Sequence, residues 1–143
     1  MYSVCKEFSF DAAHRLHSLE YVSKCKNLHG HKYFITLRLY NDKLNECDMI
    51  LDFTHFKLFQ KFLDDQLDHS ILISEDDQQL LDIAKQLDNR YFVFKGCKLT
   101  TSENIAKYLF EIAKTFYFGL TTEIEVTVHE TPKNFASFRG DSK

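Results

Sequence analysis

The chain has 143 residues, the usual length of one domain, and its content of 44% hydrophobic and 27% charged residues is ordinary for a globular protein. We therefore expect one domain over residues 1–143. The net charge of −3 excludes the strongly basic surface that nucleic-acid binding requires, so we expect no nucleic-acid partner. No apolar run is long enough to span a membrane and no export signal precedes the first charges, so we expect no membrane partner and a cytoplasmic protein.

Apolar periodicity predicts strands and helices in chain order. Residues 2–10 and 31–41 alternate apolar and polar side chains, as half-buried strands do. Asp52 and Thr54 are acceptable N-caps for a helix whose apolar side chains recur at helical spacing as far as Leu67. The remaining elements expected are a helix over 77–88, a strand over 91–95, a helix over 102–118 and a strand over 122–131. This order predicts an α+β domain, with helices on one face of an antiparallel sheet.

Three histidines lie near the ends of the first two predicted strands. His29 and His31 are two positions apart, so on a strand their side chains point to the same face. If the two strands pair as an antiparallel hairpin, His14 comes to the same end of it. Three imidazoles with an open fourth position are typical of a catalytic zinc site, although two histidines at a strand entrance can also be ordinary polar residues.

Cys25 lies four positions before His29. A thiol close to a divalent cation shifts towards the thiolate, which leaves two functional interpretations. Cys25 is either a fourth ligand that closes a structural site, or a free base or nucleophile beside the metal. The alternative without a function is that Cys25 is a small buried residue of the core. The four cysteines are widely spaced, and in a protein without an export signal we expect free thiols.

Several acidic residues also suggest chemistry. Glu130 is expected on the same face of the last predicted strand as the apolar side chains of that strand. A carboxylate on a buried face needs a partner. Thr100 and Glu103 have the spacing of a capping box at the start of a helix, which gives Glu103 a purely structural explanation. Asp68 and His69 follow the first predicted helix, where a histidine can simply interact with the negative end of the helix dipole.

Taken together, these motifs resemble the 6-pyruvoyltetrahydropterin synthase superfamily, and within it the 6-carboxytetrahydropterin synthases of queuosine biosynthesis. The matching segments occur in the family's order and cover most of the chain: FSFDAAHRL (8–16), CKNLHGHKY (25–33), ILDF (50–53), LDH (67–69), TSEN (101–104) and HET (129–131). The resemblance implies the tunnelling fold, in which two-layer α+β subunits join their sheets into a barrel. It also implies a homo-oligomer, a trimer or a hexamer of two stacked trimers, with active sites between subunits.

The resemblance further implies roles for nine residues. The expected Zn²⁺ ligands are His14, His29 and His31. The expected catalytic residues are Cys25, with Asp68 and His69 as the pair that works with it. The expected substrate-binding residues are Glu130, which anchors the pterin ring, and Thr101 and Glu103, which lie in the segment that lines the pterin pocket. Arg15 and Lys32 lie beside these motifs, but the resemblance assigns neither of them to the triphosphate.

The expected activity is a zinc-dependent lyase. It converts 7,8-dihydroneopterin triphosphate to 6-carboxy-5,6,7,8-tetrahydropterin, acetaldehyde and triphosphate, and the three-residue spacing between Cys25 and the histidine pair favours this branch. The alternative is a 6-pyruvoyltetrahydropterin synthase, which eliminates triphosphate without cleaving a carbon–carbon bond. A third interpretation, from another class, is a noncatalytic zinc-stabilised module in which Cys25 completes a closed site. Residues 74–98 are longer than in the compact members of the family.

Overall fold

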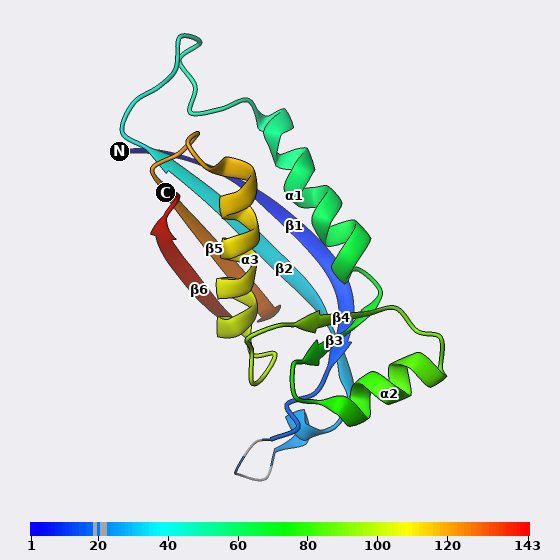
Figure 1. The fold of residues 1–143 in the computed structure, drawn as a ribbon. Coiled ribbons are helices and arrows are strands. Elements are labelled where there is room, and N and C mark those ends of the chain that lie inside the picture. Colours follow the sequence, from blue (N-terminus) through cyan, green and yellow to red (C-terminus); the bar gives the residue numbers. More distant parts are fainter. Residues whose placement is uncertain (19, 21–22) are drawn as a thin grey trace.

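The computed structural model describes residues 1–18, 20 and 23–143 (Figure 1). Within these residues, six strands form one sheet in the order β4-β3-β1-β2-β5-β6. The strands are β1 (Tyr2–His14), β2 (His29–Asn41), β3 (Ser70–Ser74), β4 (Tyr91–Phe94), β5 (Glu123–Thr131) and β6 (Asn134–Asp141). The α+β architecture that we predicted is present.

The sheet is mixed rather than antiparallel throughout. The pairs β1–β2 and β2–β5 are antiparallel, as predicted, and β5 also pairs antiparallel with β6, a strand that we did not predict. In contrast, β3 runs parallel to both β1 and β4. The strands β3 and β4 run parallel because the connection between them contains a helix, α2 (Gln78–Gln86). This helix returns the chain to the end of the sheet where β3 began. This parallel edge contains β3, which the periodicity did not predict.

Two helices cover one face of the central strands (Figure 1). The first helical segment begins with a 3₁₀ turn at Phe53–His55, continues as α1 (Phe56–Phe62) and ends as a π-helical stretch at Leu63–Leu67. The Asp52 side chain caps its start by accepting a hydrogen bond from the Thr54 amide at 2.7 Å. The other covering helix is α3 (Ser102–Tyr117).

The main core lies between these two helices and the strands. Alternate residues of β1, β2 and β5 face it, and each large apolar side chain buried there contributes about 1.5–3 kcal/mol. Its fully buried members include Ile35, Leu37, Phe56, Phe59, Ile105, Leu109, Ile124 and Val126. No helix in the described part of the chain is long and apolar enough to cross a membrane.

The helix α2 packs on the other face of the sheet. Its residues Leu80 and Ala84 form a separate cluster with Ile71 and Ile73 of β3, whereas Leu72 belongs to the main core. Because successive side chains of a strand point to opposite faces, α2 and the pair α1 and α3 lie on opposite sides of β3. Helices therefore cover one face of the central strands, as predicted, and both faces at the β3 edge.

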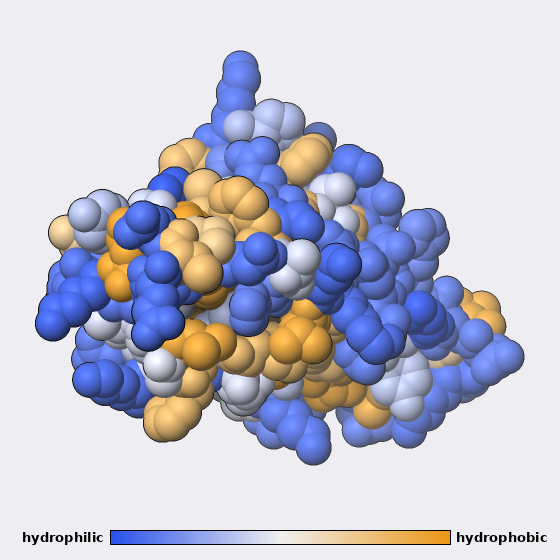
Figure 2. All heavy atoms as spheres, turned by 90° about the horizontal axis from the view of Figure 1, so that it is seen from above, coloured by the Kyte–Doolittle hydropathy of each residue, from blue (hydrophilic) through white to orange (hydrophobic). Residues whose placement is uncertain are grey.

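The end of the molecule that carries the N-terminus of β1 exposes apolar side chains among charged ones (Figure 2). Tyr2, Met49 and Phe53 line one hollow of about 310 Å³ there, with exposures of 53%, 39% and 67%. The histidines of interest lie at the opposite end of β1 and β2.

Candidate metal centre and active site

The pairing of β1 with β2 brings the three predicted metal ligands together. In the antiparallel register His14 lies opposite His29, and His31 lies opposite Ala12. The ring centroids of His14, His29 and His31 are 4.7 to 5.2 Å apart. The hairpin pairing that we predicted is therefore present, and both strands extend beyond their predicted limits to the histidines.

Backbone carbonyls fix the orientation of two of these imidazoles. His14 Nδ1 lies 2.9 Å from the Thr100 carbonyl oxygen, and His29 Nδ1 lies 2.6 Å from the Asn27 carbonyl oxygen. A carbonyl can only accept, so each Nδ1 carries the proton and donates it. The Nε2 lone pair of each ring is then free for a metal ion, which is the usual arrangement around metal-binding histidines.

Glu130 joins this cluster. Its Oε1 lies 3.0 Å from Nε2 of His14 and 3.0 Å from Nε2 of His31. These contacts are close but are not aligned as hydrogen bonds, and both Nε2 atoms are buried without a hydrogen-bond partner among the described residues. Contact with His14 holds the pKa of Glu130 below its ordinary value, and burial lowers the pKa of His31. An ionised Glu130 and a neutral His31 are therefore favoured.

The donor set fits a metal ion. One potential ligand atom from each of His14, His29, His31 and Glu130 lies within 4.8 Å of all the others. Neutral imidazole nitrogen and carboxylate oxygen are typical ligands of zinc. A cation among them would give the buried Nε2 atoms of His14 and His31 the partners that they otherwise lack.

Cys25 lies outside this cluster. It sits in a short 3₁₀ turn, Lys24–Lys26, where its amide donates to the Ser23 hydroxyl at 3.1 Å and its carbonyl accepts from the Leu16 amide at 2.8 Å. The side chain is half-buried. The fourth group in the cluster is thus the Glu130 carboxylate and not the Cys25 thiol.

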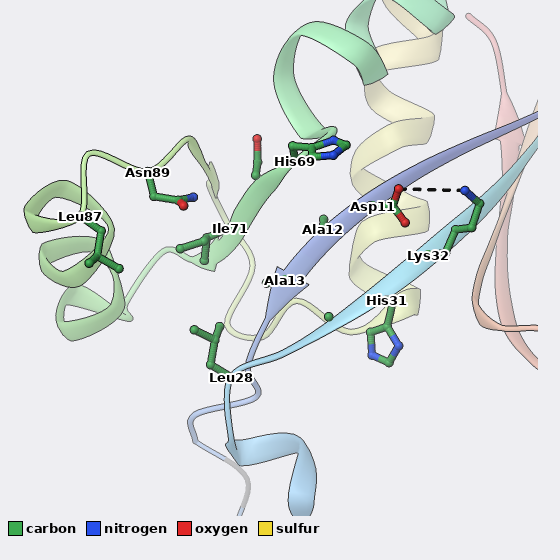
Figure 3. Close-up of a pocket in the computed structure, with 12 residues that line it drawn as sticks. Asp11, Ala12, Ala13, Leu28, His31, Lys32, His69, Ile71, Leu87 and Asn89 are labelled. Carbon is green, nitrogen blue, oxygen red and sulfur yellow. Dashed lines mark ion pairs between the residues drawn. The ribbon is translucent and has the colours of Figure 1, made fainter.

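Asp68 and His69 form a pair, and His69 lines a neighbouring pocket (Figure 3). His69 Nδ1 lies 2.9 Å from the Asp68 carboxylate, and the imidazole is 76% exposed. The His69 backbone has φ = 57°, a left-handed conformation that is uncommon for a residue with a side chain. The His69 amide donates a hydrogen bond of 2.7 Å to the Asp11 carbonyl. The pocket has a volume of about 580 Å³ and is lined by both His69 and His31, so it adjoins the histidine cluster.

The three predicted substrate-binding residues share a second, smaller pocket. Thr101, Glu103 and Glu130 line a hollow of about 210 Å³. Ser102 also lines it, and its hydroxyl donates to Glu130 Oε2 at 3.4 Å. Glu130 therefore belongs both to this pocket and to the histidine cluster.

The capping box predicted for Thr100 and Glu103 is wrong. The N-cap of α3 is Thr101, whose hydroxyl accepts from the Asn104 amide at 3.3 Å. Helix α3 starts one residue later than that motif requires, and the buried Thr100 hydroxyl instead lies 3.1 Å from His14 Nδ1. Glu103 is exposed beside the pocket and free of a capping role.

The residues that orient the imidazoles were missed at the sequence level. The Thr100 and Asn27 carbonyls are backbone groups, so residue type gives no signal for them. The two basic residues beside the motifs have local partners: Arg15 binds Asp77 through two hydrogen bonds of 2.8 and 2.6 Å, and Lys32 lies 4.0 Å from the Asp11 carboxylate (Figure 3).

Comparison with known proteins identifies relatives along nearly the whole chain. The family model "6-pyruvoyl tetrahydropterin synthase" matches residues 3–141. The 6-carboxy-5,6,7,8-tetrahydropterin synthase of Aquifex aeolicus is 30% identical, over 96% of this chain and 98% of the relative. A solved structure of an uncharacterized protein from Wolinella succinogenes superimposes with a TM-score of 0.80 at 26% identity, covering 96% and 97% of the two chains. The 6-pyruvoyl tetrahydropterin synthase of Caenorhabditis elegans superimposes with a TM-score of 0.71 at 28% identity, covering 98% and 96%.

Proposed function

The chain belongs to the 6-pyruvoyl tetrahydropterin synthase family and has its tunnelling fold, and we propose that it is a zinc-dependent 6-carboxytetrahydropterin synthase. In this proposal it converts 7,8-dihydroneopterin triphosphate to 6-carboxy-5,6,7,8-tetrahydropterin, acetaldehyde and triphosphate, as a step of queuosine biosynthesis. The observation that carries the proposal is the cluster of His14, His29 and His31, in which two rings have Nδ1 bound to backbone carbonyls. Membership of the family supplies the class of substrate.

The three imidazoles would hold Zn²⁺. A zinc ion at this position supplies a Lewis acid that lowers the pKa of hydroxyl groups on the pterin side chain. The carbonyls of Thr100 and Asn27 keep the ligands in the required tautomer.

Proton transfer is assigned to Cys25 and to the Asp68–His69 pair. Cys25 is half-buried and lies outside the metal cluster, so its thiolate is available as a general base. Asp68 holds Nδ1 of His69 at 2.9 Å, and His69 exchanges a proton with the substrate side chain through its other nitrogen. The Asp68 carboxylate stabilises the charge that His69 acquires.

Substrate binding is assigned to Glu130, with Thr101 and Glu103 in the same pocket. A pterin presents its 2-amino group and a ring N–H as adjacent donors, and one carboxylate can accept both. The pKa of Glu130 lies below its ordinary value, so the carboxylate is ionised and can accept from both donors.

We also propose a single-domain, cytoplasmic protein that acts as a homo-oligomer, either a trimer or a hexamer of two trimers. Cys25 is not among the residues lining the pocket of His69 within one chain, which supports a site completed by a neighbouring subunit. The apolar side chains exposed at the far end of β1, Tyr2, Met49 and Phe53, are suited to burial in an assembly (Figure 2).

A second candidate function is a 6-pyruvoyl tetrahydropterin synthase, the activity named for the C. elegans protein of the same fold. Two observations favour the 6-carboxy product. The three-residue spacing between Cys25 and His29 resembles the queuosine branch, and the A. aeolicus relative carries that name.

One incubation separates these functions. The zinc-loaded protein is mixed with 7,8-dihydroneopterin triphosphate without a reductant, and the pterin product is identified by mass spectrometry. We expect the 6-carboxy product together with acetaldehyde. A 6-pyruvoyl product would instead establish the second candidate, and a folded, zinc-loaded protein without turnover would point to the noncatalytic module.

A further inference from the structure

The segment that follows β1 is bound to the turn that carries Cys25. The Leu16 amide donates to the Cys25 carbonyl oxygen at 2.8 Å. Among the described residues, this is the only backbone hydrogen bond that joins the turn Lys24–Lys26 to residues outside 23–27. The position of the Cys25 thiol therefore depends on how firmly residues 15–17 are held.

Arg15 and His17, on either side of Leu16, both contact the start of α2. The Arg15 guanidinium donates to the two carboxylate oxygens of Asp77 at 2.8 and 2.6 Å. His17 Nε2 lies 3.3 Å from the Asp76 carboxylate, and His17 Nδ1 lies 3.7 Å from that of Asp77. Because α2 packs on β3, these contacts attach the segment to a fixed part of the sheet (Figure 1).

Asp77 is held from several sides. The residue is buried, and its carboxylate also accepts from the Leu80 amide at 3.2 Å as the cap of α2. Its own amide donates to the Ser74 carbonyl at 3.1 Å. A guanidinium that binds both oxygens of a carboxylate is fixed in orientation as well as in distance. Asp77 therefore fixes Arg15, and with it the neighbouring amide of Leu16.

Leu16 also lines the pocket that contains the expected substrate-binding residues. The hollow of about 210 Å³ is lined by Leu16 together with Thr101, Glu103 and Glu130. One short segment thus contacts the turn of the proposed base through its backbone and lines the proposed pterin pocket. Its position affects how the base and the pocket lie relative to each other.

We propose that Asp77 is a positioning residue for Cys25, because its pair with Arg15 fixes the segment to which the Cys25 turn is bound. The inference rests on the proposed role of Cys25 as the general base. A general base must lie within hydrogen-bond reach of the proton that it removes. A displacement of about 1 Å is enough to lower catalysis by about 100-fold. The ion pair therefore has a function in turnover besides its contribution to stability.

The test is a double-mutant cycle on turnover with Asp77→Asn and Cys25→Ala. Asparagine can still cap α2 but brings no charge to Arg15. Single turnover of 7,8-dihydroneopterin triphosphate is followed where each zinc-loaded variant is fully folded. We expect Asp77→Asn to lower the rate by about 10- to 100-fold. In the Cys25→Ala background the same change should have no further effect, because Asp77 acts through the thiol.

Two matched variants of α2 separate positioning from stability. Leu80→Ala removes a buried side chain from the cluster with Ile71 and Ile73, so it destabilises the fold without removing the ion pair. Asp82→Asn changes an exposed carboxylate of the same helix. Both folded variants should keep the parent rate. A loss of rate in Leu80→Ala as large as that in Asp77→Asn would assign Asp77 a structural role and overturn the proposal.

A second measurement does not depend on activity. Cys25 is half-buried, so release of its turn should make the thiol more accessible. Alkylation by iodoacetamide is followed at each cysteine by peptide mass spectrometry, with the exposed Cys47 as the internal reference. We expect Asp77→Asn to speed alkylation of Cys25 several-fold and to leave that of Cys47 unchanged. Equal rates at Cys25 in the variant and the parent protein would contradict the proposal.

The remaining outcomes distinguish the two levels of inference. If Asp77→Asn lowers the rate by the same factor with and without the Cys25 thiol, Asp77 acts independently of it. The inference is then wrong and the proposed function stands, as it also does if Asp77→Asn turns over substrate like the parent protein. If Cys25→Ala alone keeps full turnover, Cys25 is not the base, and that part of the proposed function fails together with the inference.

Discussion

The Asp68 carboxylate accepts from the His69 imidazole, with 2.9 Å between the carboxylate oxygen and His69 Nδ1. The other carboxylate oxygen of Asp68 accepts from the Asp11 amide of β1 at 3.1 Å. This backbone hydrogen bond is the main reason why the pKa of Asp68 lies below its ordinary value. Asp68 therefore stays ionised and holds the Nδ1 proton of His69, so the second ring nitrogen is presented to solvent and substrate.

Replacing His69 should remove activity without removing the fold. We expect His69→Asn to lower turnover by about 100-fold or more, the usual contribution of a general acid–base residue. Asparagine tolerates the left-handed backbone at this position, and the imidazole is 76% exposed, so the unfolding midpoint should hardly change. Steady-state kinetics and thermal unfolding check both statements. Full activity in the folded variant would contradict the role of the pair.

Cys25→Ala should separate a catalytic thiol from a structural ligand. Because Cys25 lies outside the four-residue cluster, we expect the variant to keep its zinc content and its unfolding midpoint. Turnover should fall by about 100- to 10,000-fold, since the base is lost. Zinc analysis, thermal unfolding and product formation are measured together, with the exposed Cys47→Ala as the control. Loss of both zinc and stability would instead support the noncatalytic module.

The sequence predicted most elements because their side chains alternate or recur at helical spacing. It missed β3, the segment Ser70–Ser74, because this strand is buried on both faces and so shows no alternation. It missed β6, Asn134–Asp141, because this strand buries no side chain completely. The order of the sheet, with β3 and β4 added in parallel beside β1, depends on packing of α2 that no local pattern records.

The histidines of the site were predictable because a hairpin register follows from local pairing, and His14 lies directly opposite His29. Contacts between distant segments were not. Thr100 is 86 residues from His14, and Asp77 is 62 residues from Arg15. Each of these contacts depends on where a later helix begins, so no local sequence pattern connects the two residues.

The ion pair between Arg15 and Asp77 predicts a stability effect next to the histidine cluster. Asp77 is buried, caps α2 by accepting from the Leu80 amide at 3.2 Å, and binds Arg15 through both carboxylate oxygens. Asp77→Asn keeps the capping ability but removes the charge. We expect a loss of about 2–3 kcal/mol in the free energy of unfolding, less than for a fully buried pair because the Arg15 side chain is 20% exposed. Denaturant unfolding at neutral pH measures it, with the exposed Asp82→Asn of the same helix as the control.

The difference between the parent protein and Asp77→Asn should also depend on pH. Burial alone would raise the pKa of Asp77, but the hydrogen bonds from Arg15 and from the Leu80 amide outweigh it and leave the pKa below the ordinary value of 3.8. A carboxylate whose pKa is lower in the folded state stabilises the fold fully above its unfolded pKa, and this contribution is lost as the pH falls through the folded pKa. The difference in unfolding free energy should therefore be constant between pH 7 and pH 5, within error, and shrink below about pH 4. A difference that already disappears near pH 6 would show that another group carries it, and one that persists unchanged at the lowest pH would show that the charge of Asp77 does not stabilise the fold.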